Sequence, residues 1–135
     1  MILLDTSVVS AVLRRRRRGE REQALATRVS ALLNSDDIVG LPGIVFQELL
    51  SGIAERAQQE RVLAAVRESF PVVLATEGDH LKAADLANWS ARKGLALSSP
   101  DALIAAQTLN RRAQLFTIDG DFGSLVGLAG LRLVK

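Results

Sequence analysis

The sequence contains no cysteine, which excludes disulfides, thiolate zinc sites and cysteine nucleophiles. This absence suits a reducing compartment, so a cytoplasmic location is expected. His80 is the single histidine, which argues against a histidine metal site and against a Ser-His-Asp triad. Only three prolines occur and 48% of the residues are hydrophobic, so disorder is not expected. Any metal site in this chain must therefore rely on oxygen ligands.

Long apolar segments are also missing from the chain. No apolar run approaches the roughly 20 residues of a membrane-spanning helix, and the N-terminus lacks the basic and apolar regions of a secretory signal. The net charge is only +2, yet five arginines form an unbroken run at residues 14–18. This run either contacts phosphate or is the solvated end of a helix. With 135 residues, the chain is expected to form a single domain, residues 1–135.

Short apolar runs alternate with helical patterns along the chain. Strands are predicted at residues 2–4, 37–41, 72–74, 113–117 and 131–134. Helices are predicted at about residues 7–13, 20–33, 44–53, 55–70, 77–93 and 100–112. Pro71 and Gly94 are expected to end two of these helices, and Ser99 is expected to cap the last one. The alternation predicts an α/β fold with a parallel sheet covered by helices on both faces.

Four acidic residues are candidates for one site. Asp5 ends the first strand and Asp119 follows the strand at residues 113–117, so both are expected at the carboxyl edge of the sheet, where ligands bind in open α/β folds. Asp101 is expected in the first turn of an apolar helix. Glu48 is expected one or two turns into the helix that follows the second strand. This topology permits all four carboxylates to converge.

Convergence of four carboxylates requires a partner of opposite charge. Two carboxylates 4 Å apart repel by roughly 4 kcal/mol at an effective dielectric of 20, so a cluster takes up protons or binds cations. Hard oxygen ligands select Mg²⁺ or Mn²⁺ rather than zinc. Such a site can activate water and stabilise the charge that develops on a phosphodiester. The four acids therefore predict metal-dependent phosphodiester hydrolysis.

Each of these acids also has an ordinary structural interpretation. Asp5 can be only a helix cap, and Asp101 can serve only to favour the dipole of its helix. Asp119 and Asp121 can be turn residues, because aspartate is common in turns. Six further acids are interpreted as solvated surface charges: Asp36, Asp37, Glu55, Glu77, Asp79 and Asp85.

Four sequence fragments, taken jointly, are more specific than any single acid. They are ILLDTS at residues 2–7, QEL at 47–49, PDALIAA at 100–106 and LFTIDGDF at 115–122. In their order and spacing they closely resemble the PIN-domain nucleases, and within that family the VapC toxins of bacterial toxin–antitoxin pairs. The resemblance covers essentially the whole chain.

The resemblance implies a three-layer α/β/α PIN domain that acts as a Mg²⁺- or Mn²⁺-dependent endoribonuclease. It implies a catalytic and metal-binding quartet of Asp5, Glu48, Asp101 and Asp119. Thr6 or Ser7 is expected to order the site, and Asp121 is an alternative to the fourth acid. A homodimer is also implied, together with a cognate antitoxin, VapB, whose tail covers the active site. The five arginines are not part of the family pattern.

Two other functions compete with a nuclease. The first is an aspartate-based phosphatase with Asp5 as the nucleophile, which would be expected to carry a second aspartate two residues later, where this chain has Ser7. The second is a catalytically inactive PIN-like domain that binds RNA or a protein partner. The presence of all four acids argues against this second alternative.

Overall fold

The computed structural model describes residues 1–13 and 19–135, so the predictions made for the arginine run lie outside the described residues. Within these residues, the strands are Ile2–Leu4 (β1), Val39–Pro42 (β2), Val72–Val73 (β3) and Gln114–Phe116 (β4). The longer helices are Thr6–Leu13 (α1), Glu20–Leu33 (α2), Gly43–Ser51 (α3), Arg56–Ser69 (α4), Glu77–Arg92 (α5) and Ser99–Asn110 (α6). A 3₁₀ turn at Gly120–Phe122 (η1) leads into the short helix Gly123–Ala129 (α7).

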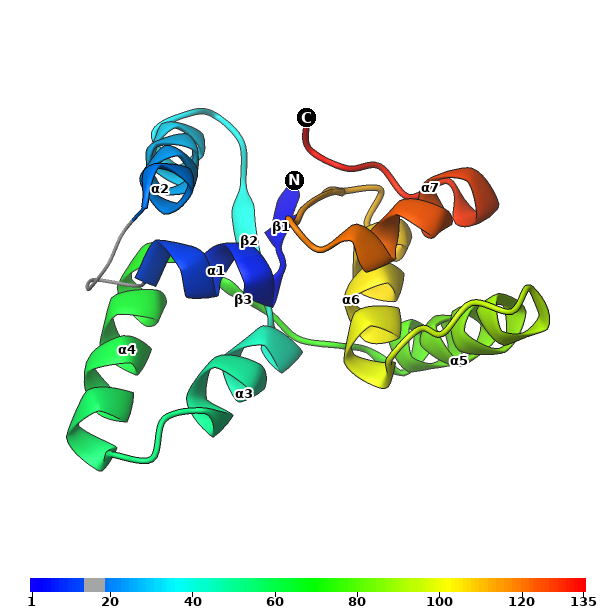
Figure 1. The fold of residues 1–135 in the computed structure, drawn as a ribbon, viewed down its shortest axis with the longest axis horizontal. Helices are drawn as coiled ribbons and strands as arrows, with labels where there is room; N and C mark the ends of the chain where they lie inside the picture. Colours follow the sequence, from blue (N-terminus) through cyan, green and yellow to red (C-terminus); the bar gives the residue numbers. More distant parts are fainter. Residues whose placement is uncertain (14–18) are drawn as a thin grey trace.

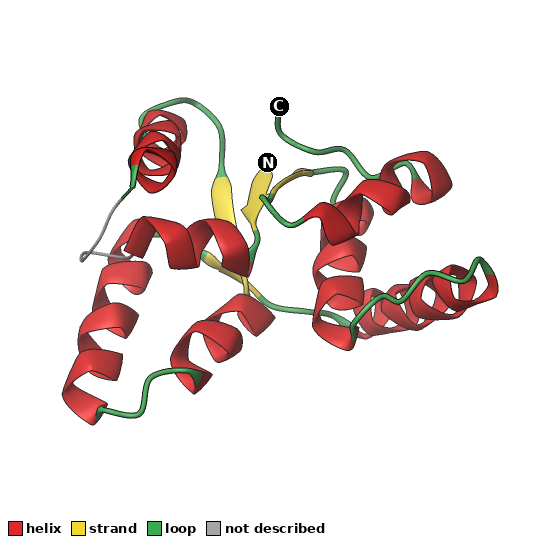
Figure 2. Cartoon of the chain, viewed as in Figure 1, coloured by secondary structure: helices red, strands yellow, loops and turns green. Residues whose placement is uncertain are grey.

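The sheet has the strand order β3-β2-β1-β4, and every neighbouring pair is parallel. Helices α1–α4 lie on one side of the strands and α5–α7 on the other, as Figures 1 and 2 show. Leu3, Leu4 and Leu41 of the two central strands are fully buried, which explains why these strands read as continuous apolar runs. The predicted three-layer α/β/α fold with a parallel sheet is confirmed.

The pairing of β1 with β4 determines which residues meet at the carboxyl edge of the sheet. Leu4 is the register partner of Phe116, and the backbone N–H of Asp5 donates to the carbonyl oxygen of Phe116 at 3.0 Å. The residues that follow the two strands therefore lie side by side. Asp5 and Thr117 become neighbours although 112 positions separate them in the sequence.

Two glycines occupy positions where another residue would be unfavourable, Gly40 because of close side chains and Gly94 because of its backbone conformation. A Cβ atom on Gly40 of β2 would lie 2.8 Å from Val73 Cγ2 and 3.2 Å from Leu3 Cδ2, so any other residue would force these two side chains to shift. Gly94 has a φ of 73° directly after α5, and the N–H of Leu95 donates to the carbonyl of Ser90 at 2.9 Å. Gly94 thus ends the helix, as its position in the sequence predicts.

The C-terminal part differs most from the prediction. The strand expected at residues 131–134 is reduced to a single parallel bridge between Leu115 and Leu133, and α7 was not predicted. The cap of α6 is also different: the side chain of Ser98, rather than that of Ser99, accepts the N–H of Asp101 at 3.3 Å.

Among the described residues, no helix combines the length and the apolar character that crossing a membrane requires.

Asp79 was predicted to be a solvated surface charge, and this prediction is wrong because Asp79 is only 1% exposed. Arg111 contacts it with two guanidinium nitrogens, at 3.1 Å and 2.9 Å, and Asn110 donates to it at 2.9 Å. The backbone N–H of Thr76 adds a fourth bond at 2.9 Å. Burial alone raises the pKa of this carboxyl, but the bonds from Arg111, Thr76 and Asn110 outweigh burial and hold the pKa well below its usual value.

Candidate metal centre

Asp5 lies where the buried strand β1 ends and α1 begins, and it is only 3% exposed. Its Oδ2 atom accepts the hydroxyl of Ser7 at 2.6 Å and the hydroxyl of Thr117 at 2.8 Å. The backbone N–H of Ser7 also points to Oδ2, at 3.4 Å. All three of these bonds reach Oδ2, and no described residue donates a hydrogen bond to Oδ1. The carboxylate is therefore held by one oxygen and can offer the other to a ligand.

The loop after β4 carries the next two acids. The backbone N–H of Asp119 donates to the Thr117 hydroxyl at 2.9 Å, and Asp119 Oδ1 accepts the backbone N–H of Asp121 at 2.9 Å. This second bond caps the 3₁₀ turn η1 and bends the chain so that both side chains point the same way. The turn thus places Asp121 beside Asp119.

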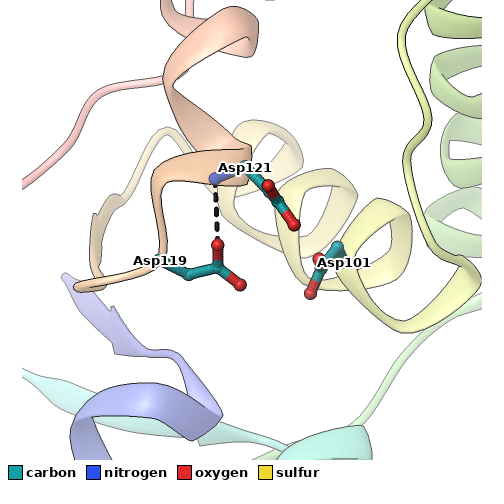
Figure 3. Close-up of side chains that lie close together, drawn as sticks. All are labelled: Asp101, Asp119 and Asp121. Atoms are coloured by element: carbon teal, nitrogen blue, oxygen red, sulfur yellow. Dashed lines mark hydrogen bonds between the residues drawn. The ribbon is translucent and has the colours of Figure 1, made fainter.

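Asp101 projects from the first turn of α6 towards these two acids (Figure 3). One carboxylate oxygen from each of Asp101, Asp119 and Asp121 lies within 4.8 Å of the other two. The separation is short enough for one cation to contact all three. Within the part of the chain that the structure describes, no lysine or arginine forms an ion pair with them.

The environment of Asp101 opposes its ionisation. Its pKa is raised from 3.8 to about 6, and burial is the main cause. The hydrogen bond with Ser98 works against this rise. The negative charges of Asp5, Asp119 and Glu48 add to it, which means that all three carboxylates are close enough to repel Asp101. The repulsion expected from the sequence for a convergent acidic cluster is therefore present at this residue.

Glu48 approaches the same region from helix α3 and is exposed. Its Oε1 atom accepts the hydroxyl of Thr6 at 2.7 Å, so the first residue of α1 orients it. A groove of about 880 Å³ begins at these two side chains and continues between α1, α3 and α4. Apolar side chains line much of it, among them Leu13, Leu49 and Val62.

The structure arranges the predicted quartet in two parts. Asp101 and Asp119 belong to the close group, which also contains Asp121. Asp5 and Glu48 do not belong to that group, although their charges act on Asp101. Thr6 and Ser7 were expected to order the site: Thr6 contacts Glu48, and Ser7 contacts Asp5. Sequence reasoning missed Thr117, whose position directly after a strand and two residues before Asp119 was the available signal.

Comparisons with known proteins agree with this geometry. The model of the PIN domain family matches residues 2–128. A comparison with curated proteins finds no match. Among solved structures, VapBC2 from Rickettsia felis, bound to a promoter DNA fragment, superposes with a TM-score of 0.81 at 19% identity, covering 99% of this chain and 98% of that chain. VapBC-1 from nontypeable Haemophilus influenzae gives 0.78 at 24% identity, with 100% and 98% covered.

A third structural neighbour is a toxin described by the RNA loop that it cleaves. Mycobacterium tuberculosis VapC20, described as a toxin that cleaves the sarcin-ricin loop, superposes with a TM-score of 0.70 at 22% identity, covering 99% of this chain and 98% of that chain. At these identities, the superpositions show a shared fold. Together with the family match, they confirm the resemblance to the PIN domain family that the four sequence fragments indicated.

Proposed function

Because the chain belongs to the PIN domain family, we propose that it is a metal-dependent endoribonuclease that hydrolyses RNA phosphodiester bonds, and the toxin of a VapBC-type toxin–antitoxin pair. The observation that carries this proposal is the cluster of Asp101, Asp119 and Asp121, with Asp5 and Glu48 beside it. VapC20, which has the same fold and is described as a sarcin-ricin loop cleaving toxin, supports RNA as the substrate class.

The side chains of this cluster fit a hard divalent cation. All candidate ligands are carboxylate oxygens, which favour Mg²⁺ or Mn²⁺. Asp101, Asp119 and Asp121 would hold the ion, with Asp5 and Glu48 as the adjacent acids. A bound ion of this kind supplies an activated water and stabilises negative charge on the scissile phosphate. We propose this role for Mg²⁺ or Mn²⁺ in the present chain.

The protein's own contribution is to hold these carboxylates in place. Ser7 and Thr117 orient Asp5 through Oδ2 and leave Oδ1 without a hydrogen bond from the described residues. Asp101 keeps a proton on its carboxyl group up to a pH of about 6, so protons and a cation compete for this side chain. Thr6 keeps Glu48 directed towards the mouth of the groove.

The same proposal includes partners and location. We propose that residues 1–135 form one domain, that two copies associate, and that a VapB-type antitoxin binds the chain in the cytoplasm. The support is the series of structural neighbours, several of which are toxin–antitoxin complexes.

An RNA cleavage assay tests the proposal. The purified chain, freed of any bound partner, is expected to cleave structured RNA in Mg²⁺ or Mn²⁺ and to stop when a chelator is added. Asp101→Asn should lower the rate by about a hundredfold or more, because it removes negative charge from the ion site. The exposed Asp36→Asn is the matched control and should cleave like the parent. Binding of RNA without cleavage would favour the inactive PIN-like domain, and full activity of Asp101→Asn would refute the assignment.

A further inference from the structure

Thr117 connects two of the strand-end acids through a single oxygen atom. Its hydroxyl donates to Asp5 Oδ2 at 2.8 Å and accepts the backbone N–H of Asp119 at 2.9 Å. A hydroxyl has one proton and free lone pairs. Because an ionised carboxylate only accepts hydrogen bonds, the proton points to Asp5, and a lone pair is left for the N–H of Asp119. Thr117 thereby fixes Asp5 with respect to the backbone that carries Asp119.

Ser7 makes a similar connection one residue earlier in the same loop. Its hydroxyl donates to Asp5 Oδ2 at 2.6 Å and accepts the backbone N–H of Ile118 at 3.2 Å. The two hydroxyl oxygens are 3.4 Å apart, and both already direct their protons to the carboxylate. Consecutive N–H groups of the β4 loop are therefore tied to one carboxylate oxygen by two side chains.

The two hydroxyls differ in the backbone N–H group that each of them accepts. Ser7 contacts the N–H of Ile118, whose side chain is exposed, whereas Thr117 contacts the N–H of Asp119 itself. Asp119 in turn accepts the N–H of Asp121, so the tie from Thr117 continues to the second acid of the loop. A series of hydrogen bonds therefore runs from the Asp5 carboxylate through the Thr117 hydroxyl to the loop that carries Asp119 and Asp121.

We propose that Thr117 is a positioning residue of the metal centre, whose hydroxyl fixes the Asp5 carboxylate relative to the backbone that carries Asp119. The inference rests on the proposed function in so far as the cluster binds a cation. Groups that orient the ligands of a metal ion commonly change its affinity by about 10- to 100-fold when they are removed. The hydroxyl of Thr117 meets that description through two hydrogen bonds to two different acids.

Titration with Mn²⁺ alone, followed by calorimetry, tests this role without RNA. Thr117→Val keeps the branched shape and removes both hydrogen bonds, so Mn²⁺ should bind about 10- to 100-fold more weakly than to the parent. Thr117→Ser keeps the hydroxyl and should restore the affinity to within about threefold. Thr27→Val is the matched control, because Thr27 on α2 also donates a hydrogen bond, to the Gln23 carbonyl at 3.0 Å, but is exposed and far along the chain.

Amide hydrogen exchange of the metal-free protein gives a second readout that needs neither RNA nor metal. The N–H of Asp119 should exchange about tenfold faster or more in Thr117→Val, since it loses its acceptor, and Thr117→Ser should restore slow exchange. Unchanged Mn²⁺ affinity in folded Thr117→Val, or a Thr117→Ser variant as weak as Thr117→Val, would overturn the inference. Failure of the proposed function looks different: the parent would cleave no RNA, whereas the Mn²⁺ and exchange results would still decide the role of Thr117.

Discussion

Replacing Asp101 with asparagine should stabilise the metal-free protein at pH 8. The pKa of Asp101 rises from 3.8 to about 6 on folding, so between these values the folded state holds a proton that the unfolded chain has lost. The unfolding free energy then falls as the pH rises from 3.8 through about 6. Above about pH 6, the full loss of stability caused by ionised Asp101 is present. Asparagine carries no charge and avoids the penalty.

The size of the effect follows from the pKa. One pKa unit corresponds to about 1.4 kcal/mol, so the unscreened penalty is about 3 kcal/mol. Asp101 is partly exposed, and solvent screening lowers this to about 1–2 kcal/mol. For a chain of 135 residues, the unfolding entropy is roughly 0.28 kcal/mol per kelvin. The melting temperature of Asp101→Asn should therefore exceed that of the parent by about 4–7 °C.

Thermal unfolding in the presence of a chelator measures this difference. Parent, Asp101→Asn and the control Asp36→Asn are compared at about pH 4 and pH 8, and the advantage of Asp101→Asn should shrink to a small fraction at the lower pH. Adding Mg²⁺ should reverse the order, because a ligand at a hundred times its Kd stabilises the protein that binds it by about 2.7 kcal/mol. If metal-free Asp101→Asn melts below the parent at pH 8, or the difference is the same at both pH values, Asp101 has a structural role and the reasoning is refuted.

Two further predictions concern the frame around the site. Arg111→Met should lower the unfolding free energy in urea by about 2–4 kcal/mol, because Asp79 is left buried without its cation, whereas Arg56→Met in the exposed pair on α4 should cost less than about 0.5 kcal/mol. Because the pKa of Asp79 is lowered in the folded state, the loss of unfolding free energy caused by Arg111→Met should be present above about pH 4 and should shrink as the pH falls. Equal losses of unfolding free energy for Arg111→Met and Arg56→Met would contradict this prediction. Ser98→Ala should cost about 1 kcal/mol by removing the cap of α6, and an unchanged midpoint would show that the cap contributes nothing.

The apolar pattern predicted helices α1–α6 and strands β1–β4 to within a few residues, because most of them bury one stripe or one run of apolar side chains. The segment after η1 offers no such signal. Helix α7 is seven residues long and contains Gly123 and Gly127, both poor helix formers. Residues 131–134 alternate apolar side chains with Arg132 and were predicted as a strand, but only Leu133 pairs with β4, through a single bridge.

The positions of the acidic residues could be predicted only in part from the local sequence pattern. Strand ends and helix starts were enough to predict that Asp5 and Asp101 lie at the same edge of the sheet. The choice between Asp119 and Asp121 could not be made, because it depends on the 3₁₀ turn that directs both carboxylates towards Asp101. Asp79 was assigned to the surface because its partner Arg111 lies 32 positions away in the sequence.

Asp79 and Asp101 also explain what distinguishes a structural acid from a ligand in this fold. Burial raises the pKa of both, and the outcome depends on the groups that surround each carboxylate. Asp79 is bonded to the guanidinium of Arg111, and its pKa falls. Asp101 is surrounded by further carboxylates, has no cationic partner among the described residues, and its pKa rises. A carboxylate that is paired within the chain gains nothing from a metal ion, whereas one that is repelled by its neighbours gains from any cation that reaches it. The affinity of the cluster for a divalent ion is thus expected to arise from the same burial and charge repulsion that destabilise the metal-free fold.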